Sequence, residues 1–295
     1  MERNLLKCIV VLVILLFSSG PSYSTEEGPA VWLFSAQPEG YFPAFFEIHL
    51  KRILPVSQLQ TINLYSIHSG ELEKNINPKM NLARIIIIMD FSEELTDVFF
   101  QKCKNIEFHE KPFLITWNCD LTNLPDYFHS IPITINWELV LEELQTILSV
   151  YQSPAFIVHH NESYIQDFLM SSQNHLQYQL IFDDNKPYHL PSSQMVYLTS
   201  REDIMKEYLS FSHHIICFES STLTLAEIQA GHILAAIDFK PSQLAAQISD
   251  LFSNGTNNKS NLTLTPLLIL PESLSEADAY EVLHRCFMCG NDQTQ

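Results

Sequence analysis

Cys286 and Cys289 have the CxxC spacing of a redox dithiol, the first of three patterns in this sequence that could do chemistry. A catalytic dithiol needs its reactive cysteine at the N-terminus of a helix, where the dipole lowers the pKa of the thiol. Here the pair follows an expected helix and lies close to the end of the sequence. The pattern therefore favours a structural or intermolecular disulfide over catalysis.

The second pattern is two histidine pairs, His159-His160 and His213-His214, which flank expected strands. Adjacent side chains on a strand point to opposite faces, so neighbours cannot easily chelate one metal ion. We predict surface histidines at strand ends and no metal site.

The third pattern is Asp90 and Ser92, which follow four consecutive isoleucines in the segment Arg84–Phe91. The isoleucines leave no polar face, which indicates a strand of a parallel sheet that is buried on both sides. Ligands bind at the carboxyl ends of such strands, so Asp90 and Ser92 are candidate ligand-binding residues. The alternative is that Ser92 caps the following helix. Asp183-Asp184, after another expected strand, hold a similar position.

The sequence contains no glycine-rich phosphate loop and no GxSxG, HExxH, Walker or kinase motif. A search for a Ser/His/Asp triad would always succeed in a chain with 12 histidines, so we assign none. We predict no catalytic residue and no cofactor.

Strands and helices alternate along the whole chain, which predicts an α/β fold with parallel sheets and right-handed crossovers. The expected strands are Ala30–Ala36, Thr61–Ile67, Arg84–Phe91, Lys111–Trp117, Pro154–Val158, Tyr178–Phe182, His214–Phe218, Ala235–Phe239 and Leu262–Leu270. The expected helices include Tyr41–Leu54, Trp137–Tyr151, Ser163–Ser172, Ser221–Leu234, Pro241–Phe252 and Ser273–Cys286. Asp120–Pro132 and Asp183–Ser193 are expected loops.

Residues 1–24 are predicted to be a secretory signal peptide. Arg3 and Lys7 form a basic start, Cys8–Phe17 is apolar, and Ser22–Ser24 offers small residues for cleavage. The apolar run of about ten residues is too short to span a bilayer. We therefore expect a secreted or extracellular chain without a membrane span.

Four Asn-X-Ser/Thr sequons agree with that compartment and predict glycosylation at Asn161, Asn254, Asn258 and Asn261. The last three fall in or beside Ser253–Asn261, which we expect to be a polar surface loop.

The formal net charge is −18, and it becomes about −19 when the signal peptide, with Arg3, Lys7 and Glu2, is removed. This acidity argues against binding nucleic acid or an anionic membrane surface.

Five cysteines remain after cleavage of the signal, an odd number in an oxidising compartment. One arrangement uses Cys103, Cys119, Cys286 and Cys289 in two internal bonds and leaves Cys217 as a buried thiol in a monomer. The other pairs Cys103 with Cys119 and leaves Cys286 or Cys289 for a bond between chains, which would make a homo- or hetero-oligomer.

The order of elements resembles the two-lobed, type I periplasmic-binding-like extracellular domain. It is most similar to the amino-terminal domain of ionotropic glutamate receptors and of related chemosensory receptors. The resemblance covers roughly residues 30–270 and rests on the succession of Arg84–Phe91, Lys111–Trp117, the helix that starts at Asn136-Trp137, and Pro154–Val158.

The resemblance implies lobe 1 at residues 25–152, lobe 2 at 153–240, and an abbreviated return towards lobe 1 with a C-terminal tail at 241–295. It implies a non-catalytic receptor-type domain that acts in receptor assembly, modulation or ligand sensing. The alternative is a secreted protein that binds a small molecule between its lobes, and the second alternative is a secretory-pathway enzyme. The family's usual disulfide would pair Cys103 with Cys286 or Cys289.

Overall fold

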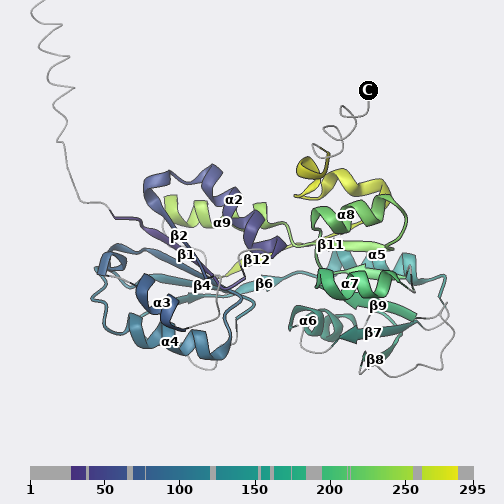
Figure 1. Ribbon diagram of the computed structural model, residues 1–295, viewed down its shortest axis with the longest axis horizontal. Coiled ribbons are helices and arrows are strands. Elements are labelled where there is room, and N and C mark those ends of the chain that lie inside the picture. Colours follow the sequence, from purple (N-terminus) through teal and green to yellow (C-terminus); the bar gives the residue numbers. More distant parts are fainter. Residues whose placement is uncertain are drawn as a thin grey trace, which may run out of the picture.

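The computed structural model describes residues 28–37, 40–64, 69–76, 78–119, 124–151, 154–159, 163–173, 175–183, 195–210, 212, 214–254 and 261–284. These residues form two lobes, each a sheet flanked by helices (Figure 1). The predicted α/β fold of two lobes with parallel sheets is confirmed. The predicted signal peptide, Asn161, Asn258, Asp184, Cys286 and Cys289 lie outside the described residues.

Lobe 1 is built on a five-stranded parallel sheet in the order β2-β1-β3-β4-β5. Its strands are β1 (Val31–Ser35), β2 (Leu59–Asn63), β3 (Ile85–Met89), β4 (Phe113–Trp117) and β5 (His129–Ile131). The central strand β3 is fully buried. Ile85 and Ile87 pack in one hydrophobic cluster while Ile86 and Ile88 pack in another, which explains why this strand has no polar face.

Helices cover both faces of this sheet (Figure 1). One face carries α2 (Tyr41–Ile53) and α9 (Pro241–Asn254), which pack on each other although they are distant in sequence. The other face carries α3 (Ser69–Asn75) and α4 (Glu93–Cys103). The shorter helices η1 (Val56–Gln58) and η2 (Pro78–Leu82) lie in the connections before β2 and β3.

Lobe 2 has a six-stranded sheet in the order β13-β11-β10-β9-β7-β8, parallel except for β13. Its strands are β7 (Ala155–His159), β8 (Gln179–Asp183), β9 (Met195–Thr199), β10 (Ile215–Cys217), β11 (Ala235–Asp238) and β13 (Leu267–Ile269). Its helices are α5 (Glu138–Leu148), α6 (Ser163–Ser172), α7 (Glu202–Leu209), α8 (Thr222–Gln229) and η4 (Pro271–Glu276).

The described chain crosses between the lobes three times: between β5 and α5, between β11 and α9, and between β12 (Leu262–Leu264) and β13. β6 (Ile133–Ile135) and β12 form a two-stranded parallel ribbon that lies between the lobes (Figure 1). Because α5 packs on β13, it belongs to lobe 2, so the first crossing precedes the expected boundary at residue 152. The return consists of α9 and β12, and neither adds a strand to the lobe 1 sheet.

Several elements differ from the sequence-based expectation. The expected loop Asp120–Pro132 contains β5, whose three residues are too few to show a hydrophobic pattern. Strand β9 was not expected, yet it lies in the middle of the lobe 2 sheet. The expected strand Leu262–Leu270 is divided, because the chain crosses between the lobes at residues 265 and 266. The expected helix Ser273–Cys286 begins instead as the 3-10 helix η4.

Candidate functional site

A cleft of about 200 Å³ lies between the two lobes, at the carboxyl ends of strands from both sheets. Lobe 1 lines it with residues that follow β1, β3 and β4: Gln37, Gly40, Tyr41, Phe42, Pro43, Asp90, Trp117 and Asn118. Lobe 2 and its second crossing line it with residues that follow β9, β10 and β11: Ser200, Arg201, Phe218, Glu219 and Phe239. This is the edge at which open parallel sheets bind their ligands.

Asp90 lies on the wall of the cleft, directly after the central strand β3. Asp90 and Asn118 have positive φ angles of 58° and 49°, a conformation that Asp and Asn adopt more readily than other side chains. The amide of Asn118 donates a hydrogen bond of 2.7 Å to Oδ1 of Asp90. Burial raises the pKa of Asp90 to about 6, against the lowering effect of that hydrogen bond. The two side chains therefore form a fixed polar pair at the end of neighbouring strands.

Ser92, the other predicted ligand-binding residue, has a structural role in the described chain. Its Oγ accepts a hydrogen bond of 3.4 Å from the backbone N–H of Leu95, so it is the N-cap of α4. It is not among the residues that line the cleft. The structure thus places one of the two candidates on the cleft and the other at a helix end.

Aromatic rings form one side of the cleft and continue between the lobes. Phe42 stacks on Trp117 at 4.1 Å between ring centroids, and Phe239 meets Trp117 edge-on at 5.5 Å. Phe239 also contacts Trp137 at 5.7 Å, and Trp137 contacts Phe218 at 6.1 Å. Because Phe239 and Trp137 lie in two of the crossings, the ring contacts run continuously from lobe 1 to lobe 2.

Lobe 2 presents two charged residues to the cleft that sequence analysis did not identify. Arg201 follows β9 and forms an ion pair with Asp203 at 2.5 Å between Nη2 and Oδ2. Glu219 follows β10, and its carboxylate accepts a hydrogen bond of 2.8 Å from the backbone N–H of Tyr41 in lobe 1. The rule that singled out Asp90, applied to the residue after every strand, would have found Glu219. Arg201 was missed because β9 itself was missed.

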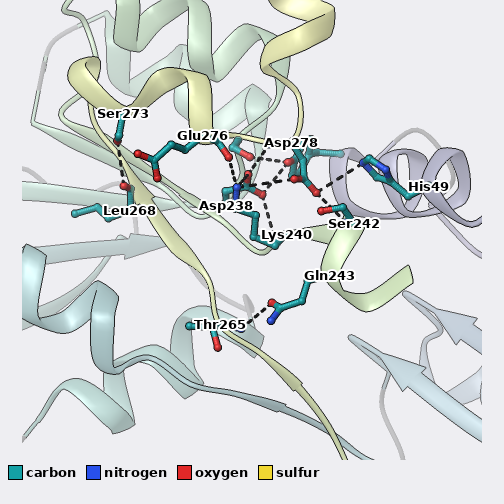
Figure 2. Close-up of polar contacts among 12 residues, drawn as sticks. His49, Asp238, Lys240, Ser242, Gln243, Thr265, Leu268, Ser273, Glu276 and Asp278 are labelled. Atoms are coloured by element: carbon teal, nitrogen blue, oxygen red, sulfur yellow. Dashed lines mark hydrogen bonds and ion pairs between the residues drawn. The ribbon is translucent and has the colours of Figure 1, made fainter. Parts of the chain in front are cut away.

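A polar cluster of Asp238, Lys240 and Asp278 adjoins the cleft at the second crossing (Figure 2). Asp238 is completely buried, and burial raises its pKa. It accepts hydrogen bonds from the backbone N–H groups of Lys240 at 2.9 Å and Asp278 at 2.7 Å. Lys240 Nζ lies 3.8 Å from Asp238 and 3.9 Å from Asp278, so the cation partly compensates two carboxylates. Oδ2 of Asp278 also lies 3.7 Å from Nε2 of His49, which belongs to α2.

The cysteines within the described chain are thiols. Cys103 is buried at the end of α4, and burial raises its pKa well above the usual range. The predicted Cys103–Cys119 disulfide is therefore absent from this structure. Cys119 instead donates to the carbonyl oxygens of Trp117 at 3.1 Å and Ile88 at 3.4 Å. The remaining arrangements depend on Cys286 and Cys289, which lie outside the described residues.

The described residues also bear on two other classes of site. They contain no group of three or more His, Cys, Asp and Glu side chains placed to hold a metal ion. No helix among them has the length and apolar character needed to cross a bilayer.

No protein-family model and no curated protein matches this chain by sequence. Solved structures do match it. An ABC transporter, LacI family transcriptional regulator from Brachyspira murdochii matches with a TM-score of 0.62 at 13% identity, over 88% of this chain and 99% of that chain. The chain has the type I periplasmic-binding-protein fold.

Two further structures have the same fold. A Caulobacter myo-inositol binding protein matches with a TM-score of 0.57 at 14% identity, over 84% of this chain and 95% of its own. A periplasmic ribose ABC transporter from Conexibacter woesei matches with a TM-score of 0.59 at 11% identity, over 84% of this chain and 94% of its own. The TM-scores show that the fold is shared, while identities this low assign no residue a role.

Proposed function

We propose that this protein binds a small polar molecule in the cleft between its lobes, without catalysing a reaction. The observation that carries the proposal is the convergence of the Asp90–Asn118 pair from lobe 1 with Arg201 and Glu219 from lobe 2, beside buried aromatic rings. A concave site with apolar walls and a few placed polar groups is the usual form of a small-molecule site.

The size and chemistry of the cleft favour a polyol or monosaccharide. Its volume of about 200 Å³ is below the roughly 300–1,000 Å³ typical of pockets for drug-sized ligands. Hydroxyl groups can donate to carboxylates and accept from amide and guanidinium groups. One similar structure is named a myo-inositol binding protein and another a periplasmic ribose ABC transporter, which supports the same class of ligand.

The comparisons support this binding function better than the receptor-domain interpretation. The similar structures described above are named as a myo-inositol binding protein, a periplasmic ribose ABC transporter and an ABC transporter, LacI family transcriptional regulator. The element order that resembles the glutamate receptor domain is equally explained by the fold of those proteins. None of the three is named as an enzyme, which favours binding over the secretory-pathway enzyme as well.

We also propose that the protein acts outside the cytosol, as a secreted or extracellular glycoprotein. The predicted signal peptide and four sequons support this location. Asn254, at the end of α9, and Asn261 are both exposed, as glycan attachment requires. Glycosidase treatment of the secreted protein, followed by electrophoresis and N-terminal sequencing, tests the location. An unglycosylated product that retains residues 1–24 would contradict it.

Thermal shift and titration calorimetry with myo-inositol, D-ribose, D-arabinose and D-allose test the binding function. A ligand at 100 times its Kd should stabilise the protein by about 2.7 kcal/mol. Asp90→Ala should weaken binding of the same ligand at least about tenfold, because it removes a hydrogen bond to a charged group. Ser92→Ala is the matched control, since that residue lies two positions away but only caps a helix.

The two variants separate site-specific binding from a general effect on the fold. Equal loss of affinity in Asp90→Ala and Ser92→Ala would mean that Asp90 has no special role. Failure of every tested sugar and polyol to shift the melting temperature of the parent would reject the proposed class of ligand.

A further inference from the structure

Tyr41 belongs to lobe 1, but its polar atoms contact lobe 2. It is the first residue of α2, and only 5% of its surface is exposed. Its hydroxyl donates a hydrogen bond of 2.9 Å to Oδ1 of Asp238 and accepts one of 2.7 Å from Oγ of Ser220. Its backbone N–H donates at 2.8 Å to Glu219. One residue therefore makes three hydrogen bonds across the cleft that it lines.

The N-terminus of α2 is capped from the other lobe and not by its own N-cap side chain. Helix N-termini leave backbone N–H groups without intrahelical partners, and a Ser, Thr, Asp or Asn at the N-cap usually accepts from one of them. The N-cap of α2 is Gly40, which has no side chain to do so. Glu219 of the other lobe accepts from the N–H of Tyr41, the first helical residue, which an N-cap side chain would not reach, and its negative charge also suits the positive end of the helix dipole.

The contact with Asp238 is equally tied to the arrangement of the lobes. Asp238 is completely buried, and its carboxylate accepts from the Tyr41 hydroxyl. It also contacts Lys240 and the backbone N–H groups of Lys240 and Asp278 (Figure 2). A buried polar group is costly when it loses a partner. The Tyr41 hydroxyl therefore completes the cluster only while α2 lies against the end of β11.

We propose that Tyr41 is the positioning residue that holds the two lobes at the angle that shapes the binding cleft. The expected effect of Tyr41 on ligand affinity rests on the proposed function. The expected effect on the arrangement of the lobes does not. Removing the Tyr41 hydroxyl should let the lobes separate, and a ligand would then have to supply the free energy of closure.

Small-angle X-ray scattering of the full, secreted protein without ligand tests the geometric part. Tyr41→Phe keeps the ring and removes the hydroxyl, so the radius of gyration and maximum dimension should increase. Tyr178→Phe is the matched control: its hydroxyl also donates to one oxygen, of Leu169 at 2.9 Å, and accepts from one serine, Ser172 at 3.1 Å. All three control residues lie in lobe 2, so the control should lose stability without changing the dimensions.

Calorimetry with myo-inositol or D-ribose, whichever binds the parent, tests the coupling. Tyr41→Phe should raise its Kd about three- to tenfold, as expected for the loss of an ordinary hydrogen bond, while Tyr178→Phe leaves the Kd unchanged. If neither these probes nor D-arabinose and D-allose bind the parent, the proposed class of ligand fails but the scattering result still stands. Scattering curves of Tyr41→Phe that match those of the parent would overturn the inference. If Tyr41→Phe is not secreted, scattering of Ser220→Ala tests the inference instead. This variant removes only one of the hydrogen bonds of the Tyr41 hydroxyl, so the radius of gyration should increase by less than is expected for Tyr41→Phe.

Discussion

Asp90 illustrates how a single half-buried carboxylate can serve a site at a cost to stability. Its pKa of about 6 in the folded protein exceeds the value of 3.8 for an unperturbed aspartate, because burial disfavours the charged form. The folded state therefore holds this proton more tightly than the unfolded state. The resulting stabilisation is present in full below pH 3.8 and is lost as pH rises through about 6.

Asp90→Asn should remove this pH dependence. Asparagine has the same shape, tolerates the φ of 58° and can still accept from Asn118. We expect the variant to be about 1–3 kcal/mol more stable than the parent at pH 7 and nearly equal to it at pH 4. Denaturant unfolding at several pH values between 4 and 7 measures the difference.

Asp97→Asn is the control for net charge, because Asp97 is exposed on α4. The control should leave the difference between pH 4 and pH 7 as it is in the parent. A slope of stability against pH that is the same in Asp90→Asn as in the parent would mean that Asp90 is well solvated in the folded protein.

At the scale of elements, the sequence predicted most strands but not β5, β6 or β9. Strand β3 and helix α4 follow from the four isoleucines and from Ser92-Glu93-Glu94, because burial on both faces and helix capping leave local signatures. Strands β5 and β6 have three residues each, too few for a pattern, whereas β9 has five residues and was overlooked after the expected loop Asp183–Ser193. The existence of two parallel sheets was thus predictable, while one edge strand of the lobe 1 sheet and one inner strand of the lobe 2 sheet were not.

The candidate site was predictable only in part, for a related reason. Asp90 was identified because its strand was certain. Arg201 was missed together with β9, whereas Glu219 directly follows the expected strand His214–Phe218 and could have been identified by the same rule. The contact between Glu219 and Tyr41 joins residues 178 positions apart, so no local pattern could reveal it.

The central strand gives a sharp test of the two hydrophobic clusters. Ile86 and Ile87 are both completely buried, on opposite faces of the sheet. Ile86→Asp and Ile87→Asp should each place an unpaired charge in the core, costing several kcal/mol or forcing protonation. We expect both variants to be retained in cells or to melt far below the parent, as measured by secretion and thermal unfolding.

Gln60→Asp is the control, because Gln60 is exposed on the edge strand β2. It should be secreted and should melt close to the parent. Normal secretion and melting of either isoleucine variant would be incompatible with a strand that is covered on both faces.

At the scale of the whole molecule, the lobes share more than their connections. The larger hydrophobic cluster contains residues of both lobes, including Leu33 and Ile87 of lobe 1 and Phe156 and Ile216 of lobe 2. The smaller cluster, with Phe34 and Ile86, lies within lobe 1. A core that continues between lobes favours cooperative unfolding over independent unfolding of each lobe.

Phe239 is the residue whose loss should uncouple the lobes. It is 2% exposed, lies in a crossing, and contacts the rings of Phe42, Trp117 and Trp137. Phe239→Ala should lower stability by about 3–5 kcal/mol. We expect the parent to unfold in one calorimetric transition and Phe239→Ala to unfold in two, with a calorimetric enthalpy above the van't Hoff value.

Phe34→Ala separates this uncoupling from simple destabilisation. Phe34 is as deeply buried as Phe239, but its ring contacts, with Trp32 and Phe99, lie entirely within lobe 1. The control should lower the melting temperature by a similar amount while both lobes still unfold together, because the ring contacts between the lobes remain. Two resolved transitions in the parent, or the same transition shape in both variants, would mean that the lobes are joined only by their connecting strands.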